Sequence, residues 1–205
     1  MKNEKPILFR GEMVRAILDG RKTQTRRVIK PQPELRANGS VLWWKNDMLV
    51  PESTYRSPYG APGDRLWVKE TFSHEDGWYP DDAGHSWKNC RSPIGHDGLC
   101  TYVHYRASMS TKQIREYNDD PWPWTPSIFM PRWASRITLE VVSVRVERVQ
   151  DISHRDAIAE GVAARVVPLS QNAFAHLWDS INAKRGYSWD SNPFVWVIEF
   201  RRITL

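Results

Sequence analysis

Three residues near the N-terminus are of types that can take part in nucleophilic catalysis or in anion binding. Lys22, Thr25 and Arg27 follow closely on Gly20, which ends a short segment of apolar periodicity. A threonine hydroxyl becomes a nucleophile when a base removes its proton, and a lysine can be that base if burial or nearby cations lower its pKa. Arg27 could contribute to that lowering, or it could bind a carbonyl or phosphate oxygen.

The same cations also have a simpler interpretation. Residues 12–19 carry apolar side chains at helical spacing, and Gly20 suits the left-handed position that commonly ends a helix. Lys22, Arg26 and Arg27 would then be solvated charges that complement the dipole at the helix C-terminus. Local physics favours this interpretation, above all for Arg26, so the rest of the chain has to decide between the two.

The elements that would position these residues are short strands and a few helices. The periodicity predicts strands at 6–9, 25–29, 41–44, 63–72, 102–106, 136–150 and 193–203, and helices at 12–19, 151–162 and 171–184. A dozen-residue helix does not separate each pair of strands, so the pattern favours a small, mostly antiparallel barrel over a doubly wound sheet. The apolar phase switches within 136–150, as in a bulged or strongly coiled barrel strand.

One carboxylate has an unusual position in this pattern. Leu66, Val68 and Phe72 share the apolar face of the predicted strand 63–72, and Glu70 falls on that face as well. Burying an unpaired carboxylate is costly. Glu70 is therefore expected either to reach water at a strand end or to be paired inside a site.

The run Gly20-x-Lys22-x-x-Thr25-x-Arg27 resembles the signature of the ASCH domain, a small PUA-like barrel family. Four further blocks resemble that family in the same order: GDRLWV (63–68), ITLEVVSV (137–144), DAIAEG (156–161) and VWVIEF (195–200). The chain also resembles the longer phage and prophage members. The resemblance implies an α+β fold, a mostly antiparallel PUA-like β-barrel with packed helices, as a single domain over residues 1–205. The aperiodic stretches at about 31–62 and 73–127 would be two long loop insertions.

Among enzymes with an ASCH domain, this chain resembles the bacterial N4-acetylcytidine amidohydrolases, which are about half its length. The resemblance implies that Lys22, Thr25 and Glu160 form a catalytic set that removes an acyl group from the exocyclic amine of N4-acylated cytidine or a related nucleoside. Glu160 would hold the lysine and carry a proton to the leaving amine, and Glu70 competes with it for this role. The candidate residues for substrate binding are Arg26, Arg27, Trp67 and Glu70.

A function of another class stays open. ASCH and PUA-like domains are associated with RNA, and the formal net charge of +5 suits a polyanionic partner. In an RNA-binding module, with or without ribonuclease activity, the cations at positions 22, 26 and 27 would bind phosphates. Trp43, Trp44 or Trp67 would stack on bases, although the eleven tryptophans could equally cap a small core. A phage structural or accessory protein with a vacant site is a third possibility.

Neither a metal nor a cofactor is expected. His85, Cys90, His96, Cys100 and His104 are close in sequence and of zinc-binding types, but their spacing matches no paired zinc motif. The chain lacks a stretch as long as a membrane span, and its first residues lack the apolar run of a signal peptide. We therefore expect a cytoplasmic protein whose partner is a modified cytidine nucleoside or RNA. Its oligomeric state does not follow from the sequence.

Overall fold

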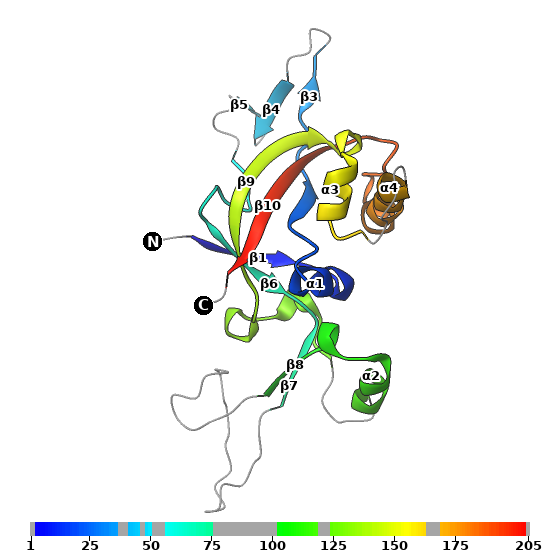
Figure 1. The fold of residues 1–205 in the computed structure, drawn as a ribbon. Coiled ribbons are helices and arrows are strands. Elements are labelled where there is room, and N and C mark those ends of the chain that lie inside the picture. The colour runs from blue at the N-terminus through cyan, green and yellow to red at the C-terminus, as the bar shows by residue number, and fades with distance from the viewer. Residues whose placement is uncertain are drawn as a thin grey trace, which may run out of the picture. The chain divides into compact units, whose positions relative to one another are not determined.

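The computed structural model describes residues 3–36, 41–45, 48–50, 56–75, 102–118, 124–162 and 169–203 (Figure 1). The chain divides into two compact units. Unit 1 comprises Met1–Lys5, Ala16–Arg65 and Leu139–Ile203, and unit 2 comprises Pro6–Arg15, Leu66–Thr138 and Thr204–Leu205. The organisation of residues 1–205 as a single domain stays a prediction.

The secondary structure agrees with most of the elements expected from periodicity. In chain order the elements are β1 (Glu4–Leu8), α1 (Gly11–Leu18), β2 (Gln24–Val28), β3 (Glu34–Leu35), β4 (Val41–Lys45), β5 (Met48–Val50), β6 (Arg65–Lys69), β7 (Phe72–Glu75), β8 (Tyr102–Tyr105), α2 (Thr111–Asn118), β9 (Thr138–Arg148), α3 (His154–Ala159), α4 (Leu169–Asn182) and β10 (Phe194–Ile203). The predicted strand 63–72 is divided in the structure: β6 ends before Glu70, and β7 begins two residues after it.

The α+β class is confirmed, but the predicted closed barrel is wrong for the described part of the chain. The main sheet is open, with the strand order β1, β6, β9, β10, β2. Strands β1 and β6 run in the same direction, because Arg65 N–H donates to Asn3 O and Phe9 N–H donates to Lys69 O. Strand β2 pairs antiparallel with β10. The sheet is therefore mixed and mostly antiparallel, and β1 and β2 are its two edges.

Strand β9 explains the change of apolar phase seen in the sequence. Both β9 and β10 follow a strong arc (Figure 1). Leu139 and Val141 near the start of β9 are buried, whereas Val142 is half exposed and Val144 is of intermediate exposure. One continuous curved strand thus carries both phases, and the second phase is only partly covered.

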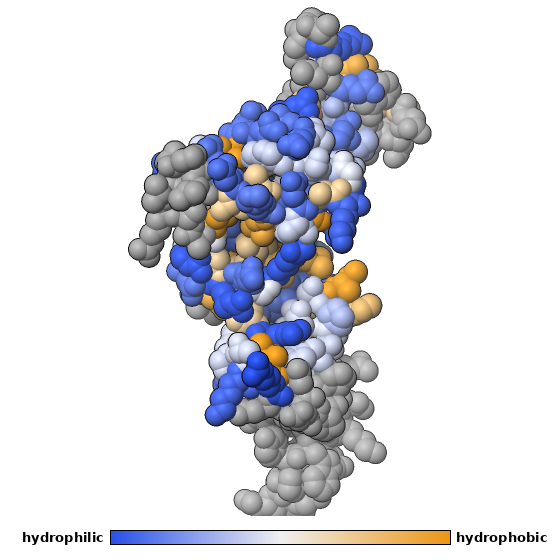
Figure 2. Space-filling view, turned by 90° about the vertical axis from the view of Figure 1, so that its right-hand side faces the viewer, coloured by the Kyte–Doolittle hydropathy of each residue, from blue (hydrophilic) through white to orange (hydrophobic). Residues whose placement is uncertain are grey.

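The core of unit 1 lies against helices α3 and α4. It consists of Val149, Ile152, Ala157, Phe174, Trp178, Val195 and Val197, with Val28, Val162 and Trp189 partly buried beside it. The aromatic residues of α4 are one helical turn apart and face the sheet, as their spacing predicted. The face seen in Figure 2 is mostly hydrophilic, with hydrophobic side chains in small separate areas. This core fixes α3, and with it the end of α3 that reaches the candidate site.

The two predicted insertions contain regular structure where they are described. Residues 31–62 include β3, β4 and β5, which form a small antiparallel sheet. Trp43 of β4 is buried, and its ring centroid lies 6.4 Å from that of Trp196 on β10. Residues 73–127 include β8 and α2, and β8 pairs antiparallel with β7. Strands β4 and β8 agree with the predictions at 41–44 and 102–106, whereas β3, β5 and α2 were not predicted.

Candidate active site

The turn after α1 directs Lys22 toward the end of α3 within unit 1. Gly20 has φ of 72°, which is the left-handed conformation expected for it. The backbone N–H groups of Arg21 and Lys22 both donate to Ala16 O at 2.9 Å, and Thr23 N–H donates to Ala159 O at 2.9 Å. The chain therefore reverses after the helix and runs against α3 before it enters β2.

The C-terminal end of α3 packs against that turn because Gly161 has no side chain. Ser153 caps the helix N-terminus, because its hydroxyl accepts a hydrogen bond from Asp156 N–H at 3.1 Å. Glu160 follows the last helical residue, and Gly161 adopts φ of 89°. A Cβ atom on Gly161 would lie only 3.2 Å from Lys22 Cβ. The absence of a side chain at Gly161 thus allows Lys22 and Glu160 to approach each other.

Lys22 and Glu160 form a buried ion pair. The Nζ atom of Lys22 donates at 2.8 Å to Glu160 Oε2, to Glu160 O and to Gln24 O. The two side chains are 2% and 5% exposed. Burial lowers the pKa of Lys22 and the charges of Arg27 and Arg26 lower it further, while Glu160 acts in the opposite direction. The amine therefore loses its proton more readily than an ordinary lysine does.

Strand β2 presents different residues on its two faces. Successive side chains of a strand alternate, so Thr25 and Arg27 share one face and Gln24 and Arg26 share the other. Thr25 is buried and pairs with Ile198 on β10. Burial lowers the pKa of Arg27, whereas the hydrogen bond with Tyr59 and the negative charge of Glu160 act in the opposite direction. Because Arg27 also affects the pKa of Lys22, the amine lies within electrostatic reach of the face that carries Thr25.

Arg26 occupies the other face of β2, among acidic side chains. Its Nη1 donates to Glu160 Oε1 at 3.3 Å, and its Nη2 lies 3.0 Å from Glu147 Oε2 and 3.4 Å from Asp156 Oδ2. With the oxygen and nitrogen of its amide exchanged, which satisfies both atoms, Gln24 joins the same group: it donates to Asp156 Oδ1 at 3.2 Å and accepts from Arg26 Nη1 at 2.7 Å. The carboxylate of Glu160 is thus shared, with Lys22 on one oxygen and Arg26 on the other.

The interpretation of these cations as solvated helix-end charges is wrong. Lys22 and Arg26 are each 3% exposed, and Arg27 is of intermediate exposure. The physical reason is the reversal at Gly20, which brings the chain back under α3 instead of out into water. Buried cations need carboxylate partners. Glu160, Glu147 and Asp156 provide them.

Glu70 belongs to unit 2, where both oxygens of its carboxylate accept hydrogen bonds. Its carboxylate is 1% exposed and accepts two hydrogen bonds from Arg136, Nε to Oε1 at 2.9 Å and Nη2 to Oε2 at 3.0 Å. The Arg136 guanidinium lies 3.9 Å from the centroid of the Tyr105 ring. The expectation that Glu70 is paired is therefore confirmed. The carboxylate that contacts Lys22 is Glu160.

The tryptophans singled out by the sequence are in different situations. Trp43 is buried against Trp196 and is not available to a base. Trp67 lies on β6 in unit 2 with the Lys69 ammonium 5.4 Å from its ring centroid. The side chain of Trp44 lies outside the described residues.

Four partners in the site were not identified from the sequence. Glu147 and Arg145 alternate on one face of β9, and this polar pair within a valine-rich strand was a signal that could have been used. Asp156 begins the DAIAEG block but was not singled out as a site residue. Tyr59 comes from a segment without periodicity, so no signal could have placed it beside Arg27.

A metal site is absent from the residues that the structure describes. His85, Cys90, His96 and Cys100 lie outside them, and His104 is on β8. Among the described helices, none combines the length and the apolar character needed to cross a bilayer.

Comparisons with known proteins give distant structural likenesses. The sequence matches no family model and no curated protein. A crystal structure of an ASCH domain from Lactobacillus crispatus JV V101 is similar at TM-score 0.42 and 12% identity, over 98% of this chain and 79% of that one. Protein EF3133 from Enterococcus faecalis V583, of family DUF984, is similar at TM-score 0.42 and 8% identity, over 99% and 81%. One of the two is therefore an ASCH domain, the family that the sequence motifs resemble.

Proposed function

We propose that this protein is an amidohydrolase that removes an acyl group from the exocyclic amine of N4-acylated cytidine or a related nucleoside. The observation that carries the proposal is the environment of the Lys22 amine. It is buried 2.8 Å from Glu160 Oε2, and its pKa is lowered. Thr25 follows Lys22 by three residues and lies on β2, the strand that also carries Arg27. The choice of an acylated cytidine rests on the resemblance of the signature at positions 20–27.

The first half-reaction would form an ester on Thr25. Neutral Lys22 takes the hydroxyl proton, and Thr25 Oγ1 attacks the acyl carbon. The bond between that carbon and the exocyclic nitrogen then breaks. Glu160, hydrogen-bonded to the lysine, passes the proton on to the leaving amine. Arg27, on the same strand face as Thr25, is placed to bind the oxygen on which negative charge develops.

The second half-reaction would release the acyl group. A water molecule gives a proton to Lys22 and attacks the ester carbon. The bond from that carbon to Thr25 Oγ1 breaks, and the threonine recovers its hydroxyl proton while a carboxylic acid leaves. Burial is essential for this cycle, because an exposed lysine would stay protonated at neutral pH and could not accept a proton.

The test is a panel of acylated cytidines incubated with the protein, with release of cytidine and the mass of the intact protein measured together. We expect cytidine release and a protein species heavier by one acyl group, located on Thr25 by peptide mapping. The Thr25→Val variant has nearly the same shape but no hydroxyl, so it should show neither the adduct nor turnover. Turnover that survives in Thr25→Val would remove Thr25 from the mechanism.

An RNA-binding function is the other outcome that the same panel can reveal when short RNAs are included. Lys22, Arg26 and Trp43 are buried, so they do not offer the phosphate and base contacts that this function was expected to use. RNA binding that weakens steeply with salt, without turnover of any acylcytidine, would favour it over the amidohydrolase.

The Glu70→Gln variant distinguishes the two candidate carboxylates. We expect it to leave acylcytidine hydrolysis at the wild-type rate, because the partner of Glu70 is Arg136 and not Lys22. Its free energy of unfolding should fall by about 1–3 kcal/mol, since an amide cannot accept both hydrogen bonds from Arg136. Urea unfolding and steady-state kinetics measure the two effects. A loss of hydrolysis in a fully folded Glu70→Gln protein would return Glu70 to the catalytic role.

A further inference from the structure

The second oxygen of the Glu160 carboxylate is held by a residue that the proposed reaction does not use. Lys22 Nζ contacts Oε2 at 2.8 Å, and Arg26 Nη1 contacts Oε1 at 3.3 Å. Both cations come from the same short stretch of chain and approach one carboxylate. The position of this carboxylate is therefore set by two partners, of which only Lys22 has a chemical role.

The Arg26 side chain is buried between acidic residues and an aromatic ring. Its side chain is 0% exposed, and Glu147 and Asp156 take its Nη2 at 3.0 and 3.4 Å. The guanidinium carbon lies 5.9 Å from the centroid of the Phe174 ring, which belongs to α4. Arg26 also lies on the face of β2 opposite to Thr25. A substrate that reaches Thr25 would not meet this guanidinium, which argues against Arg26 as a substrate-binding residue.

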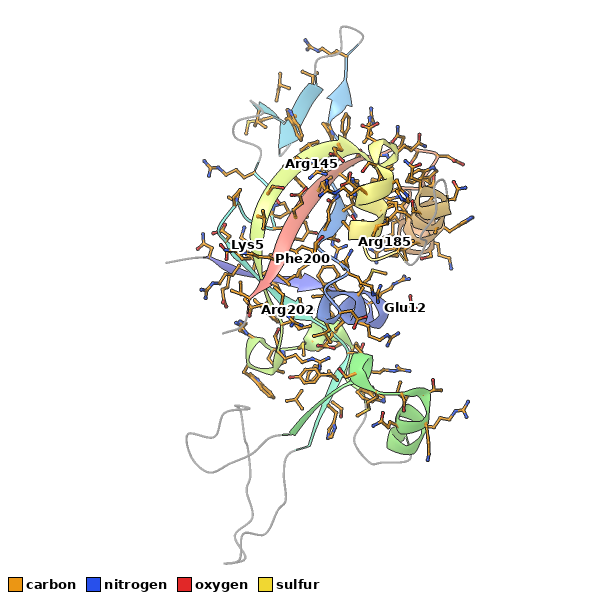
Figure 3. The ribbon with its side chains drawn as sticks, viewed as in Figure 1. Lys5, Glu12, Arg145, Arg185, Phe200 and Arg202 are labelled. Atoms are coloured by element: carbon orange, nitrogen blue, oxygen red, sulfur yellow. The ribbon has the colours of Figure 1, made fainter. Side chains whose placement is uncertain are left out.

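Glu147 and Asp156, which contact Arg26, are themselves contacted by a second arginine, Arg145. Arg145 lies on the arc of β9 (Figure 3) and contacts Glu147 at 2.5 Å, Asp156 at 3.7 Å, and Glu199. Burial raises the pKa of Asp156, but the hydrogen bonds from Ser153 and the charges of Arg26 and Arg145 lower it more, so the net shift is downward. The Asp156 carboxylate therefore stays ionised, and its contact and that of Glu147 with Arg26 Nη2 keep the planar guanidinium in one orientation.

We propose that Arg26 is a positioning residue that fixes the Glu160 carboxylate and thereby the Lys22 amine, without contacting the substrate. This inference rests on the proposed function for its kinetic consequences, but its effect on Lys22 is a property of the free protein. A rigid guanidinium fork is suited to this role, because it binds one carboxylate oxygen while its other nitrogen is anchored elsewhere. A displacement of Glu160 would move the amine relative to Thr25.

The test compares Arg26→Met and Arg26→Lys with wild type and with Arg201→Met. Arg201 is 69% exposed and pairs with Glu140 at the surface, so this control makes the same substitution outside the network. The measurements are kcat, KM and their pH profiles on an acylcytidine, and the titration of Lys22 in the substrate-free protein by NMR with labelled lysine.

We expect Arg26→Met to lower kcat by about 10²-fold with little change in KM, because misplacement of a reacting group affects the chemical step. The acid limb of the kcat profile and the NMR titration of Lys22 should both move to higher pH, since the positive charge that lowers the pKa of Lys22 is gone. Arg26→Lys keeps a cation but not the fork. It should lower kcat while the titration stays near that of wild type. Arg201→Met should match wild type throughout.

Different results overturn different claims. A raised KM with unchanged kcat and unchanged Lys22 titration in Arg26→Met would make Arg26 a substrate-binding residue and end this inference. If wild type turns over no acylcytidine, the proposed function fails, and a Lys22 titration that moves in Arg26→Met but not in Arg201→Met still supports the positioning of Lys22. If Arg26→Met does not fold, Arg26→Lys decides, because a wild-type kcat in that variant would contradict a role for the fork.

Discussion

Lys22→Ala is expected to reduce kcat/KM on an acylcytidine by about 10³-fold while the protein stays folded. A positioned general base contributes about 10² to 10⁴ to such a reaction, and no other amine contacts Glu160 Oε2 among the described residues. The fold should tolerate the change because Arg26 still neutralises Glu160 from its other oxygen. Steady-state kinetics give the activity, and circular dichroism with thermal unfolding gives the folded state.

Lys184→Ala is the matched control for this variant, because Lys184 is an exposed lysine of the same unit. It should hydrolyse the substrate at the wild-type rate. Undiminished turnover by folded Lys22→Ala would exclude Lys22 as the base, and with it the proposed mechanism. A loss of activity accompanied by unfolding would be assigned to structure, and Lys22→Met, which preserves the length and apolar part of the side chain, would then replace it as the test.

The sequence was informative wherever local chemistry determines local structure. Gly20 was assigned correctly to the left-handed position that ends a helix, because that conformation depends on a few neighbouring backbone groups. The resemblance of two blocks, at 20–27 and at 156–161, then predicted that Lys22 and Glu160 belong to one site. That pairing spans 138 positions of the chain, which periodicity alone does not connect.

The role of Arg26 could not be predicted from the same stretch. Alternation along β2 shows only that Arg26 faces away from Thr25, and not what covers that face. Its partners come from β9 and from α3, and the strand that carries Glu147 was assigned to a barrel wall. A charge beside a helix end is usually solvated, so the general expectation was reasonable and failed because the chain reverses at Gly20.

Contacts between distant parts of the chain also limited what the sequence could predict about the sheet and about Glu70. Apolar alternation identified the long strands but not whether the first and last would meet. A barrel was favoured by the order of the elements and implied by the resemblance, but closure does not occur among the described residues. For Glu70, the cost of a lone buried carboxylate predicted a partner. The identity of that partner, Arg136, depends on a contact across 66 positions.

Removal of the Glu160 charge is expected to have the largest effect on stability. In Glu160→Gln, two buried cations lose the carboxylate they share, and breaking a buried ion pair in this way costs about 3–5 kcal/mol in the free energy of unfolding. Urea unfolding at constant pH measures the loss. Glu140→Gln is the matched control, because Glu140 pairs with the exposed Arg201, and such a surface pair contributes at most about 1 kcal/mol.

The double variant Lys22→Met, Glu160→Gln should be more stable than Glu160→Gln alone, since it removes the cation that was left unpaired. The pH dependence has a definite sign. Without the carboxylate that raises it, the pKa of Lys22 falls further below its unfolded value. The folded state of Glu160→Gln then binds fewer protons than the unfolded state, so its instability should lessen as pH rises through that range and deepen as pH falls. Equal losses in Glu160→Gln and Glu140→Gln, or no gain in the double variant, would show that Lys22 and Glu160 are not energetically coupled.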